Sequence, residues 1–140
     1  MIVCSFCNQR FISSQLKCPE CGSEPHKVGN FHVFSKELPT DGDGFSVKAF
    51  EKLSVLESNN FWFSSRNNLI CNLIKKYHSD FYTLMEVGCG TGYVIKGIND
   101  NFPNRHLSGS EYFLTGLEFA QKRLPECSFF QMDAREVPFD

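Results

Sequence analysis

The sequence predicts an α/β fold preceded by a small metal-binding module, and two observations carry this prediction. Over residues 61–140, apolar strand-like segments alternate with amphipathic helical segments, which is the pattern that builds parallel sheets. Near the N-terminus, four cysteines occur as two C-x2-C pairs, which is typical of a zinc site. With 41% hydrophobic and 21% charged residues, the 140-residue chain has the composition of an ordinary globular protein.

The cysteine pairs are Cys4 with Cys7 and Cys18 with Cys21. Two residues between cysteines let both sulfurs point at one ion, so four thiolates from two tight turns can hold tetrahedral zinc. Disulfides are the alternative, but the first residues lack the apolar run of a secretory signal. Seven cysteines in all then indicate a reducing compartment. We expect a structural Zn²⁺ in a zinc knuckle over residues 1–30, and a cytoplasmic protein.

Residues 31–60 are predicted to be a linker and lid region between this module and the α/β domain of residues 61–140. The segment Pro39 to Ser46 reads PTDGDGFS, and its proline, glycines and aspartates have the chemistry of turns and loops. The chain is therefore expected to divide into three parts.

A helix is predicted between the linker and the first strand of the domain. Apolar residues recur with helical spacing from Leu69 to Tyr77, and Ser64 or Ser65 can cap the start. The helix should pack on the sheet. The aromatic run FWF at residues 61–63 has two interpretations, a lid over a ligand pocket or a staple that fixes the entry of the helix.

The glycine-rich loop that follows the apolar strand TLMEV is the most informative part of the sequence. It reads MEVGCGTG, with glycines at Gly88, Gly90 and Gly92. Such a loop lets a ligand lie against bare backbone. The dinucleotide fingerprint G-x-G-x-x-G would need a glycine where Tyr93 stands. Glu86 instead precedes the loop, where a pyrophosphate would meet like charge, so a ligand with an ammonium or sulfonium group fits better.

Acidic residues end the next two predicted strands. Glu111 ends HLSGSEYF about 20 residues after the loop, where a carboxylate can accept hydrogen bonds from ribose hydroxyls. Asp133 ends the strand CSFFQMDA and is followed by Ala134. The segments YVIKGINDNF and FLTGLEFAQKRL before these two strands are predicted to be helices.

The glycine loop, Glu111 and Asp133-Ala134, in this order, resemble the class I methyltransferases that use S-adenosylmethionine (SAM). The resemblance implies a Rossmann-like three-layer sandwich, of which the chain would hold the first three strands. It further implies that Glu86 and the loop hold the amino-acid part of SAM, Glu111 the ribose and Asp133 the adenine amino group. The expected cofactor-binding residues are Arg66, Glu86, Gly88, Cys89, Gly90, Gly92, Glu111, Tyr112, Asp133 and Ala134.

Two of these residues have specific expected roles. Arg66 follows the aromatic run, and related sequences use this region as a lid, so Arg66 is placed to meet the carboxylate of SAM. Cys89 stands between two glycines, which suggests a nucleophile. Methyl transfer from a sulfonium needs no enzyme nucleophile, however, so we expect Cys89 to line the cofactor as a small side chain.

The resemblance leaves more than one function open. The later strands of such a domain normally supply the acceptor pocket and any general base, so no catalytic residue can be named here. The favoured expectation is a SAM-dependent methyltransferase, or its cofactor-binding half, with a small-molecule or sugar-linked acceptor. The alternatives are a non-catalytic zinc- and SAM-binding module that serves as a partner subunit, and an RNA methyltransferase.

Charge and hydropathy limit the expected partners. The net charge is −2 and the sequence shows no basic face, which argues against a nucleic-acid partner. No apolar run is long enough to span a membrane. The strand TLMEV would form an open sheet edge, so we expect either the missing C-terminal half in trans or self-association through this edge.

Overall fold

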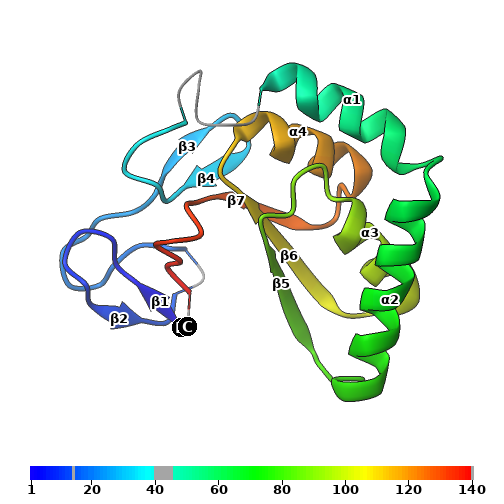
Figure 1. The fold of residues 1–140 in the computed structure, drawn as a ribbon. Coiled ribbons are helices and arrows are strands. Elements are labelled where there is room, and N and C mark those ends of the chain that lie inside the picture. Colours follow the sequence, from blue (N-terminus) through cyan, green and yellow to red (C-terminus); the bar gives the residue numbers. More distant parts are fainter. Residues whose placement is uncertain (14, 40–45, 140) are drawn as a thin grey trace.

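The computed structural model describes residues 1–13, 15–39 and 46–139, and Figure 1 shows a sheet flanked by helices with a small module beside it. The sheet has five strands in the order β3-β4-β7-β6-β5. Its strands are β3 (His26–Val28), β4 (Phe31–Val33), β5 (Thr83–Val87), β6 (His106–Glu111) and β7 (Ser128–Gln131). The pairs β5–β6, β6–β7 and β4–β7 are parallel, which confirms the predicted α/β class.

Four helices accompany the sheet within the described residues. They are α1 (Val47–Glu57), α2 (Phe61–Tyr77), α3 (Tyr93–Asn101) and α4 (Leu114–Arg123). Helices α3 and α4 pack on the sheet, α2 packs on α3, and α1 packs on α4. The core between them is apolar and consists of Phe31, Cys89, Ile95, Leu117, Ala120, Leu124 and Phe129. Among the described helices, none is both long and apolar enough to cross a membrane.

The sheet contains two strands that the sequence did not predict, β3 and β4. They form an antiparallel hairpin, and its turn contains Gly29 at φ +58°. Phe31 and Val33 alternate with the less buried His32, but three residues are too short a run to be recognised without the partner strand β7. The predicted boundary between residues 30 and 31 falls inside this hairpin.

Helix α1 occupies residues 47–57 of the predicted linker and lid region. It is anchored by Phe50, which is buried and whose ring lies 5.9 Å from that of Phe113. Gly116 on α4 permits this approach, because a Cβ there would lie 2.8 Å from the Phe50 ring. Residues 40–45 of the predicted linker Pro39 to Ser46 lie outside the described residues.

Helix α2 begins earlier than the sequence suggested. Asn60 is its N-cap, and the side-chain Oδ1 of Asn60 accepts a hydrogen bond from the Trp62 amide at 2.9 Å. The prediction that Ser64 or Ser65 caps the helix is therefore wrong, because asparagine fills that role four residues earlier. Ser64 lies inside the helix, and its hydroxyl donates to the Phe61 carbonyl at 3.0 Å.

The face of α2 that is buried also differs from the prediction. Asn67 and Cys71 are buried, whereas Leu69, Leu73 and Tyr77 are exposed. The helix packs on α3, where the Asn67 Nδ2 donates to the Tyr93 carbonyl at 3.0 Å. Three of the five residues of the predicted apolar stripe are thus exposed, and Ile70 and Ile74 are half-buried.

The N-terminal module carries the strands β1 (Ile2–Val3) and β2 (Arg10–Phe11), which pair antiparallel. It contacts the end of the chain through a hydrogen bond from the Val3 amide to the Pro138 carbonyl at 2.7 Å. Aromatic rings continue this contact: Phe34, Phe130 and Phe139 lie with centroids 5.3 to 6.0 Å apart. Together with the β4–β7 pairing, these contacts join the module to the sheet (Figure 1).

Candidate functional site

The glycine loop connects β5 to α3 at the carboxyl end of the parallel strands. Gly88, Gly90 and Gly92 have φ values of +76°, +54° and +75°, in the left-handed region that other residues rarely adopt. The amides of Gly88 and Cys89 both donate to the Ser110 carbonyl at 2.8 Å. The loop is therefore fixed to the end of β6 while most of its length is bare backbone.

Gly92 also sets the distance between the loop and α4. It is the N-cap of α3, and a Cβ at this position would lie 2.9 Å from both Cα and Cβ of Ala120. A side chain here would force the two elements apart, so the close approach of loop and helix requires glycine.

Glu111 lies against the loop from the neighbouring strand. Its Oε2 accepts a hydrogen bond from the Gly90 amide at 3.1 Å. Its Oε1 accepts from the amides of Tyr112 and Phe113 at 2.8 and 3.2 Å. The structure thus brings the predicted ribose-binding residue directly to the glycine loop. Tyr112 follows it, half-buried, with its ring packed against that of Phe113.

Glu86 supplies a second carboxylate, from β5. Burial raises its pKa to about 7, although a hydrogen bond from the Ile95 amide and the nearby charge of Arg66 act in the opposite direction. The charges of Glu111 and Glu57 raise the pKa further. Among the described residues, none hydrogen-bonds to the buried Oε2 of Glu86. This buried oxygen therefore has an unused acceptor position.

Arg66 and the aromatic run lie near this carboxylate on α2. Arg66 is exposed, and its charge reaches Glu86. The Phe63 ring packs edge-on against Tyr93, with centroids 6.1 Å apart. Phe61 and Trp62 are 80% and 62% exposed. Only Phe63 therefore fixes the helix in the manner of a staple, and its two neighbours remain accessible.

Asp133 lies after β7, at the same end of the sheet as Glu111. The Met132 amide donates to the Glu111 carbonyl at 3.3 Å, which places Asp133 beside that strand. Hydrogen bonds from the Arg135 side chain and amide lower the pKa of Asp133 to about 2. Arg135 is 84% exposed at its side chain. Ala134 is exposed between them.

Cys89 lies beneath the glycine loop. Its side chain is buried in the apolar core together with Ile95, Leu117 and Phe129. Burial, reinforced by the charges of Glu86 and Glu111, raises the thiol pKa far above its ordinary value. The thiol therefore contributes to packing beneath the loop, and its expected role as a small side chain lining the cofactor stays a prediction.

A buried polar network next to the loop was not predicted. The Thr91 hydroxyl lies 2.7 and 2.6 Å from the two carboxylate oxygens of Glu57. Arg123 Nη1 donates to Glu57 Oε2 at 3.0 Å and to Thr91 Oγ1 at 3.2 Å. Glu57 and Thr91 are separated by 34 residues and Glu57 and Arg123 by 66. No local pattern signals a contact over such separations.

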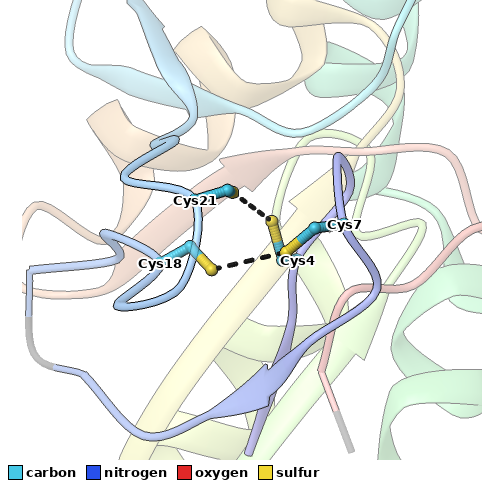
Figure 2. Close-up of side chains that lie close together, drawn as sticks. All are labelled: Cys4, Cys7, Cys18 and Cys21. Carbon is cyan, nitrogen blue, oxygen red and sulfur yellow. Dashed lines mark hydrogen bonds between the residues drawn. The ribbon is translucent and has the colours of Figure 1, made fainter.

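The four cysteines of the N-terminal module converge (Figure 2), with all four Sγ atoms within 4.8 Å of one another. The Sγ atoms of Cys4 and Cys21 are 3.6 Å apart, and those of Cys7 and Cys18 are 3.7 Å apart. Four thiolates about 2.3 Å from a tetrahedral zinc ion lie roughly 3.8 Å from one another, whereas a disulfide bond is about 2.05 Å long. The spacing fits metal ligands.

A hydroxyl supports this cluster from outside. Ser23 Oγ lies 3.1 Å from Cys4 Sγ and 2.9 Å from Cys21 Sγ. The turn that carries the second pair is closed by a hydrogen bond from the Gly22 amide to the Cys18 carbonyl at 3.0 Å, with Gly22 at φ +71°. The residues present therefore fit a structural zinc site with a hydrogen-bonded outer shell.

No protein-family model and no curated protein matches the sequence. Solved structures match the fold. The amino pentose methyltransferase CalS10 from Micromonospora echinaspora, determined with SAM bound, is 24% identical with a TM-score of 0.53. That match covers 72% of this chain and 40% of CalS10.

Two further solved structures also match the fold of this chain. A putative SAM-dependent methyltransferase from Methanococcus maripaludis has a TM-score of 0.61 at 14% identity, over 74% of this chain and 49% of that one. The sugar N-methyltransferase KedS8 from Streptoalloteichus has a TM-score of 0.54 at 19% identity, over 78% and 41%. This chain thus spans less than half the length of each of the three proteins. It has the Rossmann-like α/β fold that these methyltransferases share.

Proposed function

We propose that this chain is the cofactor-binding part of a SAM-dependent methyltransferase. The observation that carries the proposal is a loop of left-handed glycines between two carboxylates, Glu86 and Glu111, at the carboxyl ends of adjacent parallel strands. Ligands of open α/β sheets bind at this end of the strands. SAM combines two cationic groups with a ribose and an adenine, so it offers a partner for each carboxylate.

Glu86 is suited to the cationic amino-acid end of SAM. Its Oε2 is buried without a partner, and a buried oxygen in this state is costly unless a ligand donates to it. An ammonium group would supply that donor and favour the ionised carboxylate. We infer that Arg66, whose charge already reaches Glu86, faces the carboxylate of the ligand.

Glu111 is suited to the ribose. An ionised carboxylate has about four acceptor sites, and three backbone amides already donate to Glu111. Oε1 accepts two of these hydrogen bonds and Oε2 only one, so Oε2 keeps one site for a ribose hydroxyl. The amides also fix the carboxylate in place before the ligand arrives, which reduces the entropy lost on binding.

Asp133 is proposed to receive the adenine amino group, and Arg135 is its competitor. The ion pair between them is exposed on the Arg135 side, and such pairs contribute little free energy. Displacement of the Arg135 guanidinium by the ligand would therefore cost little free energy.

In this proposal, the residues around the glycine loop position the cofactor and cover one side of it. SAM supplies the activated methyl carbon, so the enzyme contributes mainly orientation and desolvation. CalS10 and KedS8 are named as methyltransferases of an amino pentose and of a sugar. On that basis, we propose a small-molecule or sugar-linked acceptor.

We also propose that Cys4, Cys7, Cys18 and Cys21 hold one structural Zn²⁺. Four protein ligands leave no open position, which separates this site from catalytic zinc. The module buries only a small apolar cluster of its own, built around Ile2 and Phe11, so metal binding would provide much of its folding free energy.

Binding of S-adenosylhomocysteine (SAH) to the purified chain tests the cofactor assignment by titration calorimetry. Glu111→Ala should weaken binding by at least about tenfold, because charge-assisted hydrogen bonds to the ribose are lost. Glu118→Ala is the matched control, since Glu118 is an exposed carboxylate on α4. A folded, monodisperse wild-type chain that does not bind SAH, or equal affinities for all three proteins, would contradict the proposal.

The pH dependence of SAH affinity tests the role of Glu86. With a pKa of about 7, Glu86 is about one-tenth ionised at pH 6 and about nine-tenths ionised at pH 8. An ammonium ligand binds the ionised form, so the Kd should be about tenfold weaker at pH 6 than at pH 8. Glu86→Gln should remove most of this difference. A wild-type Kd that does not change between the two pH values would rule this role out.

Metal analysis of the purified protein should give about one zinc ion per chain. Cys18→Ser should lose the metal and expose the N-terminal module to protease, as should chelation of the wild type. Cys127→Ser is the control, because Cys127 lies outside the cluster and donates to the Leu107 carbonyl, as a serine can. Metal-free wild-type protein with undiminished protease resistance would refute the zinc site.

The open edge of β5 is proposed to pair with a strand from the rest of the methyltransferase domain or, without it, with a second copy of this chain. Sedimentation velocity of the isolated chain should then show a mass that increases with concentration. Val87→Lys should suppress this association, because Val87 is a 45% exposed residue at the end of β5. Val55→Lys on α1 is the control, since Val55 is also exposed. A wild type that stays monomeric at all concentrations would exclude pairing between copies.

A further inference from the structure

The Glu57–Thr91–Arg123 network places a charged pair beneath the glycine loop. Glu57 and Thr91 are 4% and 1% exposed. The side chain of Arg123 is 19% exposed. An ion pair so removed from water contributes little net stability, because the loss of hydration offsets the attraction between the charges. In some proteins, such a pair instead specifies one arrangement of the groups that it joins.

The group that this pair specifies is Thr91, the residue between Gly90 and Gly92. Both glycines have positive φ, and a backbone with glycine on either side loses much conformational entropy when it is ordered. The first part of the loop is held by the Ser110 carbonyl and the middle by Glu111. The Thr91 side chain holds the last part.

The network also reaches three helices. Glu57 is the last residue of α1, and Arg123 is the last residue of α4. The Arg123 guanidinium lies over the Tyr93 ring, the first residue of α3, at 5.4 Å from its centroid. At its other end, α1 is anchored by Phe50 against Phe113. Docking of α1 therefore places Glu57 where it can hold the Thr91 hydroxyl.

We propose that Glu57 and Arg123 are positioning residues that hold Thr91, so that the glycine loop adopts its SAM-binding form only while helix α1 is docked. The proposal rests on the proposed function for the identity of the ligand. It makes cofactor affinity depend on a helix that, in the structure, reaches the loop through Glu57. By thermodynamic linkage, the ligand should in turn stabilise the docked α1.

The test combines SAH calorimetry with amide hydrogen exchange on Thr91→Val, Thr91→Ser and Glu57→Gln. Thr91→Val keeps the side-chain volume but removes the hydroxyl, and we expect SAH binding about tenfold weaker, with faster exchange at residues 88–92 and in α1. Thr91→Ser restores the hydroxyl and should restore both properties. Glu57→Gln should resemble Thr91→Val, whereas Glu51→Gln, an exposed change on the same helix, should have no effect.

A residue that only stabilises the fold would not couple the ligand to α1. In the wild type, SAH should slow exchange in α1, and this protection should be lost in Thr91→Val. Wild-type affinity and unchanged loop exchange in Thr91→Val would overturn the proposal. If the wild type does not bind SAH, the proposed function fails, but loop and α1 exchange in unliganded Thr91→Val and Thr91→Ser still decide this inference. If Glu57→Gln does not fold, the two Thr91 variants decide it.

Discussion

The parallel pairing of β5, β6 and β7 is the constraint on which the candidate site depends. It places the carboxyl ends of the three strands side by side, so residues far apart in the chain meet at this end of the sheet. The register pairs Glu86 with Gly109 and Glu111 with Gln131. Gly109 leaves room for the core below, since a Cβ there would lie 2.7 Å from the Phe129 ring. The two carboxylates can therefore approach the same loop.

The site is an acidic one whose charge is only partly compensated by the protein. Glu57 has Arg123 as a partner, and Glu111 has three backbone amides. Glu86 has one backbone amide and a nearby arginine, and its pKa is raised to about 7. A ligand that brings positive charge would compensate these carboxylates, which is the physical reason to propose SAM rather than a pyrophosphate-containing cofactor.

The sequence predicted those parts of the fold whose signals are local. The loop conformation follows from the glycines at positions 88, 90 and 92, because the left-handed φ values require them. The convergence of the four cysteines follows from two C-x2-C pairs in the same way. The roles of the proposed ligand-binding residues remain predictions that the experiments above test.

The features that the sequence did not predict depend on partners far along the chain. Strand β4 has only three residues and is defined by its pairing with β7. The buried side of α2 is set by Asn67, a polar residue that fits against Gly97 and Tyr93 and that hydrophobic periodicity would place on the surface. From the sequence alone, Glu57 would be assigned to the surface, whereas the packing of α1 buries it. In each case, tertiary contacts outweighed the local pattern.

The hairpin of β3 and β4 makes the two edges of the sheet differ in their capacity to pair with a further strand. At that end, the outermost strand is β3, which has three residues, carries Lys27 and runs antiparallel to its neighbour. Short, charged outer strands are poor templates for further pairing. At the opposite end, β5 has five residues, and its acidic residue, Glu86, is half-buried. A strand that paired with β5 would therefore lie next to the glycine loop and would form one side of the candidate site.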